Sequence, residues 1–218
     1  MSNIIDATYF EKGSLYIPNN KDMNASPEGT PTNQTDLDFF IIEYERELLL
    51  NALGIVLYEE LLTALEDLDI SAQKWKDLVN GLTYENIEGV KKRWDGLIGY
   101  NNQSVIAFYI YTKYLRNYNE TFATTGVVRN DSKNATNYDA TPKYIKAYNS
   151  FLEKYQADLL PQPRFYANRF GTEGIDWYGS EKVQVSLFQF LTDSNELDET
   201  AFPDFKFKFY EQQNSFGI

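Results

Sequence analysis

Apolar residues recur at helical spacing between residues 35 and 68, the longest such stretch of the chain. Steps of three and four residues place them on one side of a helix with 3.6 residues per turn. Glycine readily adopts the positive φ angle at which helices end, so Gly54 divides the stretch into helices at about residues 36–52 and 55–67. The first apolar stripe consists of Leu37, Ile41, Tyr44, Leu48 and Ala52. Between them lie carboxylates that we expect to face water, among them Glu43, Glu45 and Glu47.

The next apolar segment is short. Trp75 lies within it, Ser71 can cap its start and Gly81 follows its end, which predicts a helix over residues 71–80. Residues 81–103 are rich in glycine and asparagine, so we interpret them as a connecting segment whose Trp94 docks onto the core.

Two longer helices follow. Ser104 can cap a helix over residues 104–122, and the first half of that helix is hydrophobic on all sides, which indicates burial on several faces. Thr141 and Pro142 form a favoured start for a helix over residues 142–158. Its narrow apolar seam predicts packing against one neighbouring helix.

The two ends of the chain lack helical spacing. Near the N-terminus, residues 1–20 show only a short alternation, which predicts an extended arm or edge strand. Towards the C-terminus, residues 183–187 and 205–209 alternate apolar with polar side chains, which predicts two strands. Because an exposed apolar strand edge promotes aggregation, we expect the second strand to contact another chain or another strand.

The sequence therefore predicts a mainly α fold. It comprises a helical-bundle adaptor domain over residues 35–160, an extended N-terminal arm over residues 1–34 and a C-terminal arm with β-strands over residues 161–218.

The absence of cysteine and histidine changes the choice of function. It excludes disulfides, thiolate or imidazole metal sites and histidine-dependent nucleophiles. Carboxylate groups such as Glu59 with Glu60, and Asp193 with Glu196, fall on predicted polar faces or loops, so we interpret them as surface charges. We expect no enzyme activity, no metal and no cofactor.

The net charge of −12 argues against a protein that wraps nucleic acid, because phosphate binding requires clustered basic residues. No apolar run approaches the roughly 18 residues of a membrane span, and the N-terminal residues lack signal-peptide character. We therefore expect a soluble protein made in the cytosol, with no membrane partner.

Aromatic residues are abundant, with 17 Tyr, 15 Phe and 3 Trp, so we expect a surplus at interfaces. A carbohydrate-binding surface formed by Tyr16, Tyr138, Tyr166 and Trp177 is an alternative that the sequence leaves open. Protein contacts are favoured because many aromatics lie on the predicted arms. The interface candidates are Leu15, Tyr16, Ile17, Trp177, Tyr178, Phe205, Phe207 and Phe209.

Three segments carry a resemblance to a known family: FIIEYERELLLNALGIVLYEEL at 40–61, WKDLVNGLTY at 75–84, and IAFYIYTKYLRNYNETFATTGVVRNDSKNAT at 106–136. Together with the turn around Trp94 they resemble head-to-tail connector proteins of tailed phages that infect Bacteroidetes, in particular the neck ring proteins of crAss-like phages. The resemblance covers about residues 4–160, and the chain departs from the family after residue 163.

The resemblance implies a non-enzymatic virion protein, assembled in the cytoplasm of the host bacterium, that forms a ring of twelve copies on the portal protein. Its expected partners are other copies of itself, the portal, other neck ring or tail proteins, and the capsid. DNA would pass through such a ring without specific binding, because an acidic wall repels the phosphate backbone. The candidates for lining the channel are Glu43, Glu47 and Glu59.

Overall fold

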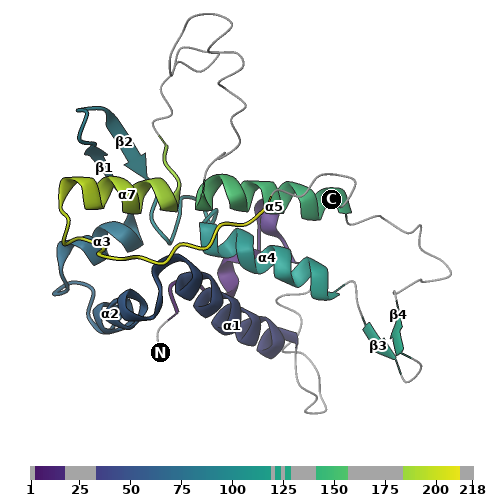
Figure 1. Ribbon diagram of the computed structural model, residues 1–218. Helices are drawn as coiled ribbons and strands as arrows, with labels where there is room; N and C mark the ends of the chain where they lie inside the picture. Colours follow the sequence, from purple (N-terminus) through teal and green to yellow (C-terminus); the bar gives the residue numbers. More distant parts are fainter. Residues whose placement is uncertain are drawn as a thin grey trace, which may run out of the picture.

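The computed structural model describes residues 3–17, 33–118, 121–123, 126–128, 141–156 and 184–211, and its elements are labelled in Figure 1. Six α-helices dominate these residues, accompanied by two short antiparallel hairpins. The buried apolar side chains form one cluster to which all six helices contribute. The predicted mainly α fold with a strand-containing region is confirmed, although the strands lie elsewhere than expected.

The predicted helix pair is present. Helix α1 spans Asn33–Leu53 and helix α2 spans Ile55–Glu66. Gly54 separates them with a φ of 79°, a conformation that suits a residue without a Cβ atom. The buried side of α1 is the predicted apolar stripe, with Leu48 and Ala52 fully buried.

Helix α4, Val105–Tyr118, lies at the centre of the molecule, between α1 and helix α5, Thr141–Tyr155 (Figure 1). Residues 105–112 are all buried, as their all-round hydrophobicity predicted. The Ser104 hydroxyl accepts a hydrogen bond from the backbone N–H of Ala107 at 2.9 Å, so the predicted cap is confirmed. The predicted end at residue 122 is wrong, because α4 ends at Tyr118 and Thr121 begins a strand.

Helix α5, Thr141–Tyr155, packs along α4 through its predicted seam, of which Tyr148, Leu152 and Tyr155 are buried. Strand β3, Thr121–Ala123, pairs antiparallel with strand β4, Gly126–Val128.

Helix α3, Gln73–Asn80, leads into an antiparallel hairpin of strands β1, Leu82–Glu85, and β2, Lys91–Trp94. The interpretation of this region as a plain connection missed the hairpin, because glycine-rich ends masked two short strands. Trp94 is buried, as predicted, and its indole N–H donates to the carbonyl of Leu78 at 3.0 Å. Ser71 does not cap α3, since its hydroxyl donates to the carbonyl of Leu68.

The N-terminal segment is not an extended arm over residues 3–17. It forms two 3₁₀ turns, Ala7–Phe10 and Gly13–Leu15, that pack against α1 and α4. The buried side chains of this segment are Ile5, Phe10, Leu15 and Ile17. Their burial offsets the cost of ordering the segment, which the local polar composition concealed.

The predicted strand at residues 183–187 is wrong as far as the described residues 184–187 show. Gln184 forms an isolated parallel bridge with Arg93 of β2, but Leu187 begins helix α7, Leu187–Leu197. The Ser186 hydroxyl caps this helix by accepting a hydrogen bond from the backbone N–H of Gln189 at 3.2 Å. Alternation over five residues suggested a strand, whereas Leu187, Phe190 and Leu191 share the buried side of a helix.

Residues 205–211 form the last described segment, which we call the strap. Apolar and polar side chains alternate along it as predicted, but it pairs with no other strand of the described chain. It runs instead between α1 on one side and α5 and α7 on the other (Figure 1, yellow). The expected strand at 205–209 is therefore corrected to an extended segment that contacts helices of its own chain.

Candidate interaction surface

The strap binds the C-terminal end of α1 through backbone hydrogen bonds. The N–H of Lys206 donates to the carbonyl of Leu53 at 3.3 Å, and the N–H of Lys208 donates to the carbonyl of Asn51 at 2.8 Å. The last carbonyls of a helix have no partner within the helix, so an extended segment can satisfy them. The strap therefore completes the end of α1.

Aromatic side chains hold the strap against α5 and α7. The ring of Phe207 stacks on Tyr155 of α5, with centroids 4.4 Å apart and planes at 27°. Phe188 of α7 contacts three alternate rings of the strap: Phe205, Phe207 and Phe209. Such ring pairs add stabilisation beyond the area that they bury. Much of the aromatic surplus expected at interfaces is thus used inside this chain.

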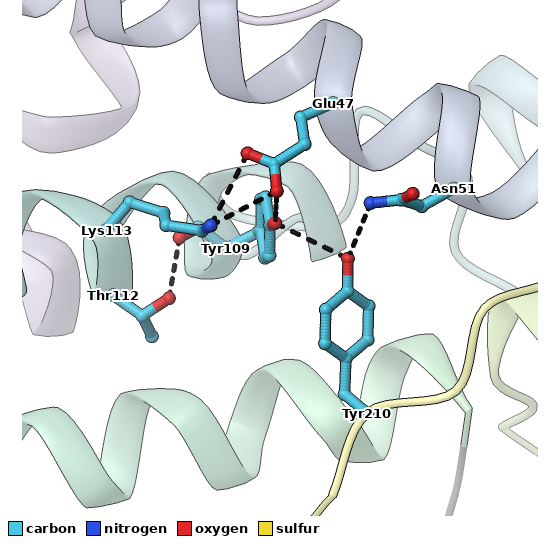
Figure 2. A network of polar contacts seen from close by, with 6 residues as sticks. All are labelled: Glu47, Asn51, Tyr109, Thr112, Lys113 and Tyr210. Atoms are coloured by element: carbon cyan, nitrogen blue, oxygen red, sulfur yellow. Dashed lines mark hydrogen bonds and ion pairs between the residues drawn. The ribbon is translucent and has the colours of Figure 1, made fainter.

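The end of the strap enters a polar network between α1 and α4 (Figure 2). Asn51 donates from Nδ2 to the hydroxyl of Tyr210 at 2.9 Å, and that hydroxyl lies 3.4 Å from the hydroxyl of Tyr109. Tyr109 in turn donates to Glu47 Oε1 at 2.8 Å, and Lys113 Nζ lies 3.2 Å from the same oxygen. The network therefore joins α1, α4 and the strap, which are far apart in sequence.

The phenol groups in and around this network are poor acids. Burial, followed by the hydrogen-bonded neighbours Tyr210 and Glu47, raises the pKa of Tyr109 far above its usual value. Burial also raises the pKa of Tyr210, and it raises the pKa of Tyr148 to about 12. These hydroxyls therefore remain protonated near neutral pH and act as hydrogen-bonding groups.

One buried hydroxyl beneath the strap differs from the others. Tyr155 is fully buried, and its hydroxyl has no hydrogen-bond partner among the described residues. A buried hydroxyl without a partner costs free energy, so Tyr155 contributes through its ring, which stacks on Phe207 and Phe151.

A buried carboxylate anchors the N-terminal segment. Glu45 of α1 is only 6% exposed, and its two carboxylate oxygens accept the backbone N–H groups of Ile4 at 2.9 Å and Ile5 at 3.2 Å. Burial raises the pKa of Glu45 to about 7, although both hydrogen bonds act in the opposite direction. The expectation that Glu45 faces water is therefore wrong.

A second buried carboxylate joins α7 to the hairpin. Asp193 is 1% exposed, accepts hydrogen bonds from the Tyr84 hydroxyl and Gln189 Nε2, both at 2.6 Å, and lies 3.5 Å from Lys92 Nζ. The interpretation of Asp193 as a surface charge is thus wrong. The carboxylates of Glu45 and Asp193 are thus both hydrogen-bonded within the fold. Proteins tolerate buried charge when it is paired in this way.

The structure places the N-terminal interface candidates in different environments. Leu15 and Ile17 are each 2% exposed in the core, so the prediction that they contact another chain is wrong. Tyr16 between them is 47% exposed and can meet a partner. Trp177 and Tyr178 lie outside the described residues.

The remaining candidates are partly engaged within the chain. Phe205 and Phe207 are half-buried in the strap, whereas Phe209 is 48% exposed. Among the channel candidates, Glu43 and Glu59 are exposed. Glu47 is bound to Tyr109 and Lys113, so its first role is to hold α1 to α4.

Sequence reasoning missed an exposed apolar face on α1. Phe39 is 64% exposed and Ile42 is 50% exposed, and their spacing of three residues places them side by side on the helix. The signal was present in the run of four apolar residues from 39 to 42, which cannot all face one side of a helix. Two further exposed side chains, Ile55 and Val56, begin α2.

No three potential ligands among Asp and Glu gather into a metal site within the described residues. Over the same ranges, none of the helices has the length and hydropathy needed to span a bilayer. No protein family model matches the chain, and neither a curated protein nor a solved structure shows significant similarity to it.

Proposed function

We propose that this chain is a structural subunit of a tailed-phage virion. In this proposal, copies of it form a closed ring in the portal-proximal neck, where the ring joins the portal to the tail and lets DNA pass. The proposal combines the resemblance of residues 4–160 to neck ring proteins with the surface properties of the described residues.

The exposed apolar face of α1 is the observation that carries the proposal. The core is already filled by the opposite side of α1, where Leu37, Ile41 and Leu48 are buried. Phe39 and Ile42 therefore take no part in the core that the described residues form, and apolar side chains grouped on a surface are typical of contacts with another protein. In a ring, this face would lie against the neighbouring subunit.

The polar interior supports a structural role over a catalytic one. Glu45 holds the backbone of the N-terminal segment, and Asp193 holds the hairpin to α7. Catalytic carboxylates need an open route to a substrate, whereas these two are occupied by the fold itself. We therefore propose a protein that acts by assembly.

Passage of DNA in this proposal depends on charge. The chain has a net charge of −12, and Glu43 and Glu59 remain exposed without belonging to the network of Glu47. A ring of such carboxylates would repel the phosphate backbone and keep DNA from adhering to the wall. Glu43 follows Phe39 by four residues and so lies next to it on α1, where the same helix can supply both the contact and the lining at its border.

Light scattering after size-exclusion chromatography of the full chain tests the proposal. The wild type is expected to form a multimer of defined mass, and Phe39→Ser with Ile42→Ser is expected to reduce it to smaller species. Ile87→Ser is the matched control, since Ile87 is 65% exposed at the hairpin turn, away from α1. A wild type that remains a single copy at every concentration contradicts the proposal, as does equal loss of the multimer in the control.

A further inference from the structure

The strap is joined to the rest of the chain by a very short connection. On one side, Phe202 is 1% exposed and is bound by the side chain of Asn195. The N–H of Phe202 donates to Asn195 Oδ1 at 2.7 Å, and Asn195 Nδ2 donates to the carbonyl of Phe202 at 2.8 Å. On the other side, the strap contacts begin at Phe205. Only Pro203 and Asp204, both exposed, lie between these anchored positions.

This connection is held in an unfavourable backbone conformation. Asp204 has a φ of 54°, in the left-handed region that residues with a side chain enter at a cost. Asp204 directly precedes the strap, which runs back in the direction opposite to α7 (Figure 1). If Asp204 relaxed to an extended conformation, the strap would leave its own chain, and short strained hinges favour such exchange between copies.

The surface that receives the strap binds it through contacts that any copy could supply. Leu53 and Asn51 accept backbone N–H groups, and Gln156 binds both backbone groups of Tyr210. The Phe and Tyr rings add stacking contacts. None of these contacts depends on which chain the strap comes from. The strap of a second copy can therefore bind this surface through the same contacts.

We propose that copies of this chain exchange straps, so that residues 205–211 of one copy occupy the surface formed by α1, α5 and α7 of the next. The exchange relaxes Asp204 while keeping the other contacts, which is the general basis of domain swapping. The inference rests on the proposed function, because it names the segment that links neighbouring copies in the ring.

Engineered cysteines test the exchange without interference, since the natural chain has none. A Cβ atom built at Gly54 would lie 3.2 Å from Lys206 Cβ, so the neighbouring exposed residue Ile55 is close to the strap. One chain carries Ile55→Cys, and a second chain of different length, extended by a tag, carries Lys206→Cys. The two are co-expressed and treated with a short bismaleimide cross-linker. The double variant Ile55→Cys/Lys206→Cys in one chain is the control for reach.

Exchange predicts a cross-linked product that contains one chain of each length. It is overturned if the double variant cross-links within one chain while the mixture yields no such product. The outcome is separate from that of the proposed function: a ring without cross-chain links would refute the exchange alone, and cross-chain links in a species that is not a ring would refute the ring alone.

A second pair of variants, made in the same cysteine-bearing chains, tests the hinge. Asp204→Gly removes the cost of the positive φ angle and is expected to lower the exchanged fraction by roughly fivefold. Asp204→Val is expected to raise it, because a β-branched residue strongly disfavours that conformation. The cross-linked fraction reports the change. Equal fractions in the two variants contradict a strained hinge that drives exchange.

Discussion

The side chain of Gln156 binds both the backbone N–H and the backbone carbonyl of Tyr210. The N–H of Tyr210 donates to Gln156 Oε1 at 2.8 Å, and Gln156 Nε2 donates to the Tyr210 carbonyl at 2.7 Å. A single side chain thus replaces the strand partner that the sequence pattern led us to expect for this segment. Gln156 lies directly after α5, 54 residues before Tyr210 in the sequence.

Gln156→Ala is expected to loosen the strap. Loss of two hydrogen bonds at a buried position lowers the free energy of unfolding by about 1–3 kcal/mol. Trypsin should then cleave faster after Lys206 and Lys208, because their backbone N–H groups would be released from α1 more often. Gln103→Ala, at an exposed glutamine, is the control and should leave the cleavage rate unchanged.

Two tyrosines beneath the strap are expected to respond in opposite ways to loss of the hydroxyl. Tyr155→Phe should leave stability unchanged or raise it by up to about 1 kcal/mol, since its buried hydroxyl has no partner among the described residues. Tyr109→Phe should lower stability by about 1–2 kcal/mol, because it removes the hydrogen bond to Glu47 and the contact with Tyr210. Urea denaturation of both variants measures the difference, and equal effects would contradict the network.

Glu45 makes stability depend on pH. Its pKa is about 7 in the folded chain, above the value of 4.5 of a solvated glutamate, so the folded state binds the additional proton. The stabilisation that protonated Glu45 gives the folded chain is fully present below pH 4.5. It is lost as the pH rises through 7, which lowers the free energy of unfolding by up to roughly 3 kcal/mol. The free energy of unfolding of the wild type should therefore fall with pH across this range, whereas that of Glu45→Gln should not fall in this way. Denaturation curves recorded at several pH values measure the difference. Glu43→Gln, at an exposed position, should follow the wild type.

Two glycines between α3 and the residues after β2 are expected to tolerate no side chain. A Cβ atom at Gly81 would lie 2.4 Å from the carbonyl oxygen of Trp94, and one at Gly96 would lie 2.4 Å from that of Val79. Alanine at either position should therefore lower the midpoint of thermal unfolding, with a cost of about 1–3 kcal/mol or more. Gly89→Ala separates this clash from backbone strain, since Gly89 has a similar φ of 75° but no neighbour within 4 Å.

The helices that sequence reasoning predicted well are those whose burial follows from local spacing. Gly54 and Ser104 marked real boundaries, and the all-round hydrophobicity of α4 correctly indicated its central position. Helix α7 was missed because the alternation over residues 183–187 indicated a strand. The helix cap at Ser186, whose hydroxyl accepts the N–H of Gln189, is evident only from the folded chain.

The parts that sequence reasoning missed depend on contacts between distant residues. Glu45 is buried because Ile4 and Ile5 return to it from 41 and 40 residues away, and no pattern along α1 reveals this. The strap alternates as a strand would, yet α1 and Gln156 take the place of a partner strand. Spacing shows which residues share a face, but it does not show which surface covers that face.

We propose that this chain functions as an assembled ring, with the Phe39 and Ile42 face between subunits. Electron cryo-microscopy of the full chain, concentrated and purified as its largest stable species, images that contact. Closed rings are expected, with this face of α1 buried against a neighbour and Glu43 towards the bore. A homogeneous particle of one 25.3 kDa copy, with Phe39 and Ile42 still facing solvent, would contradict it.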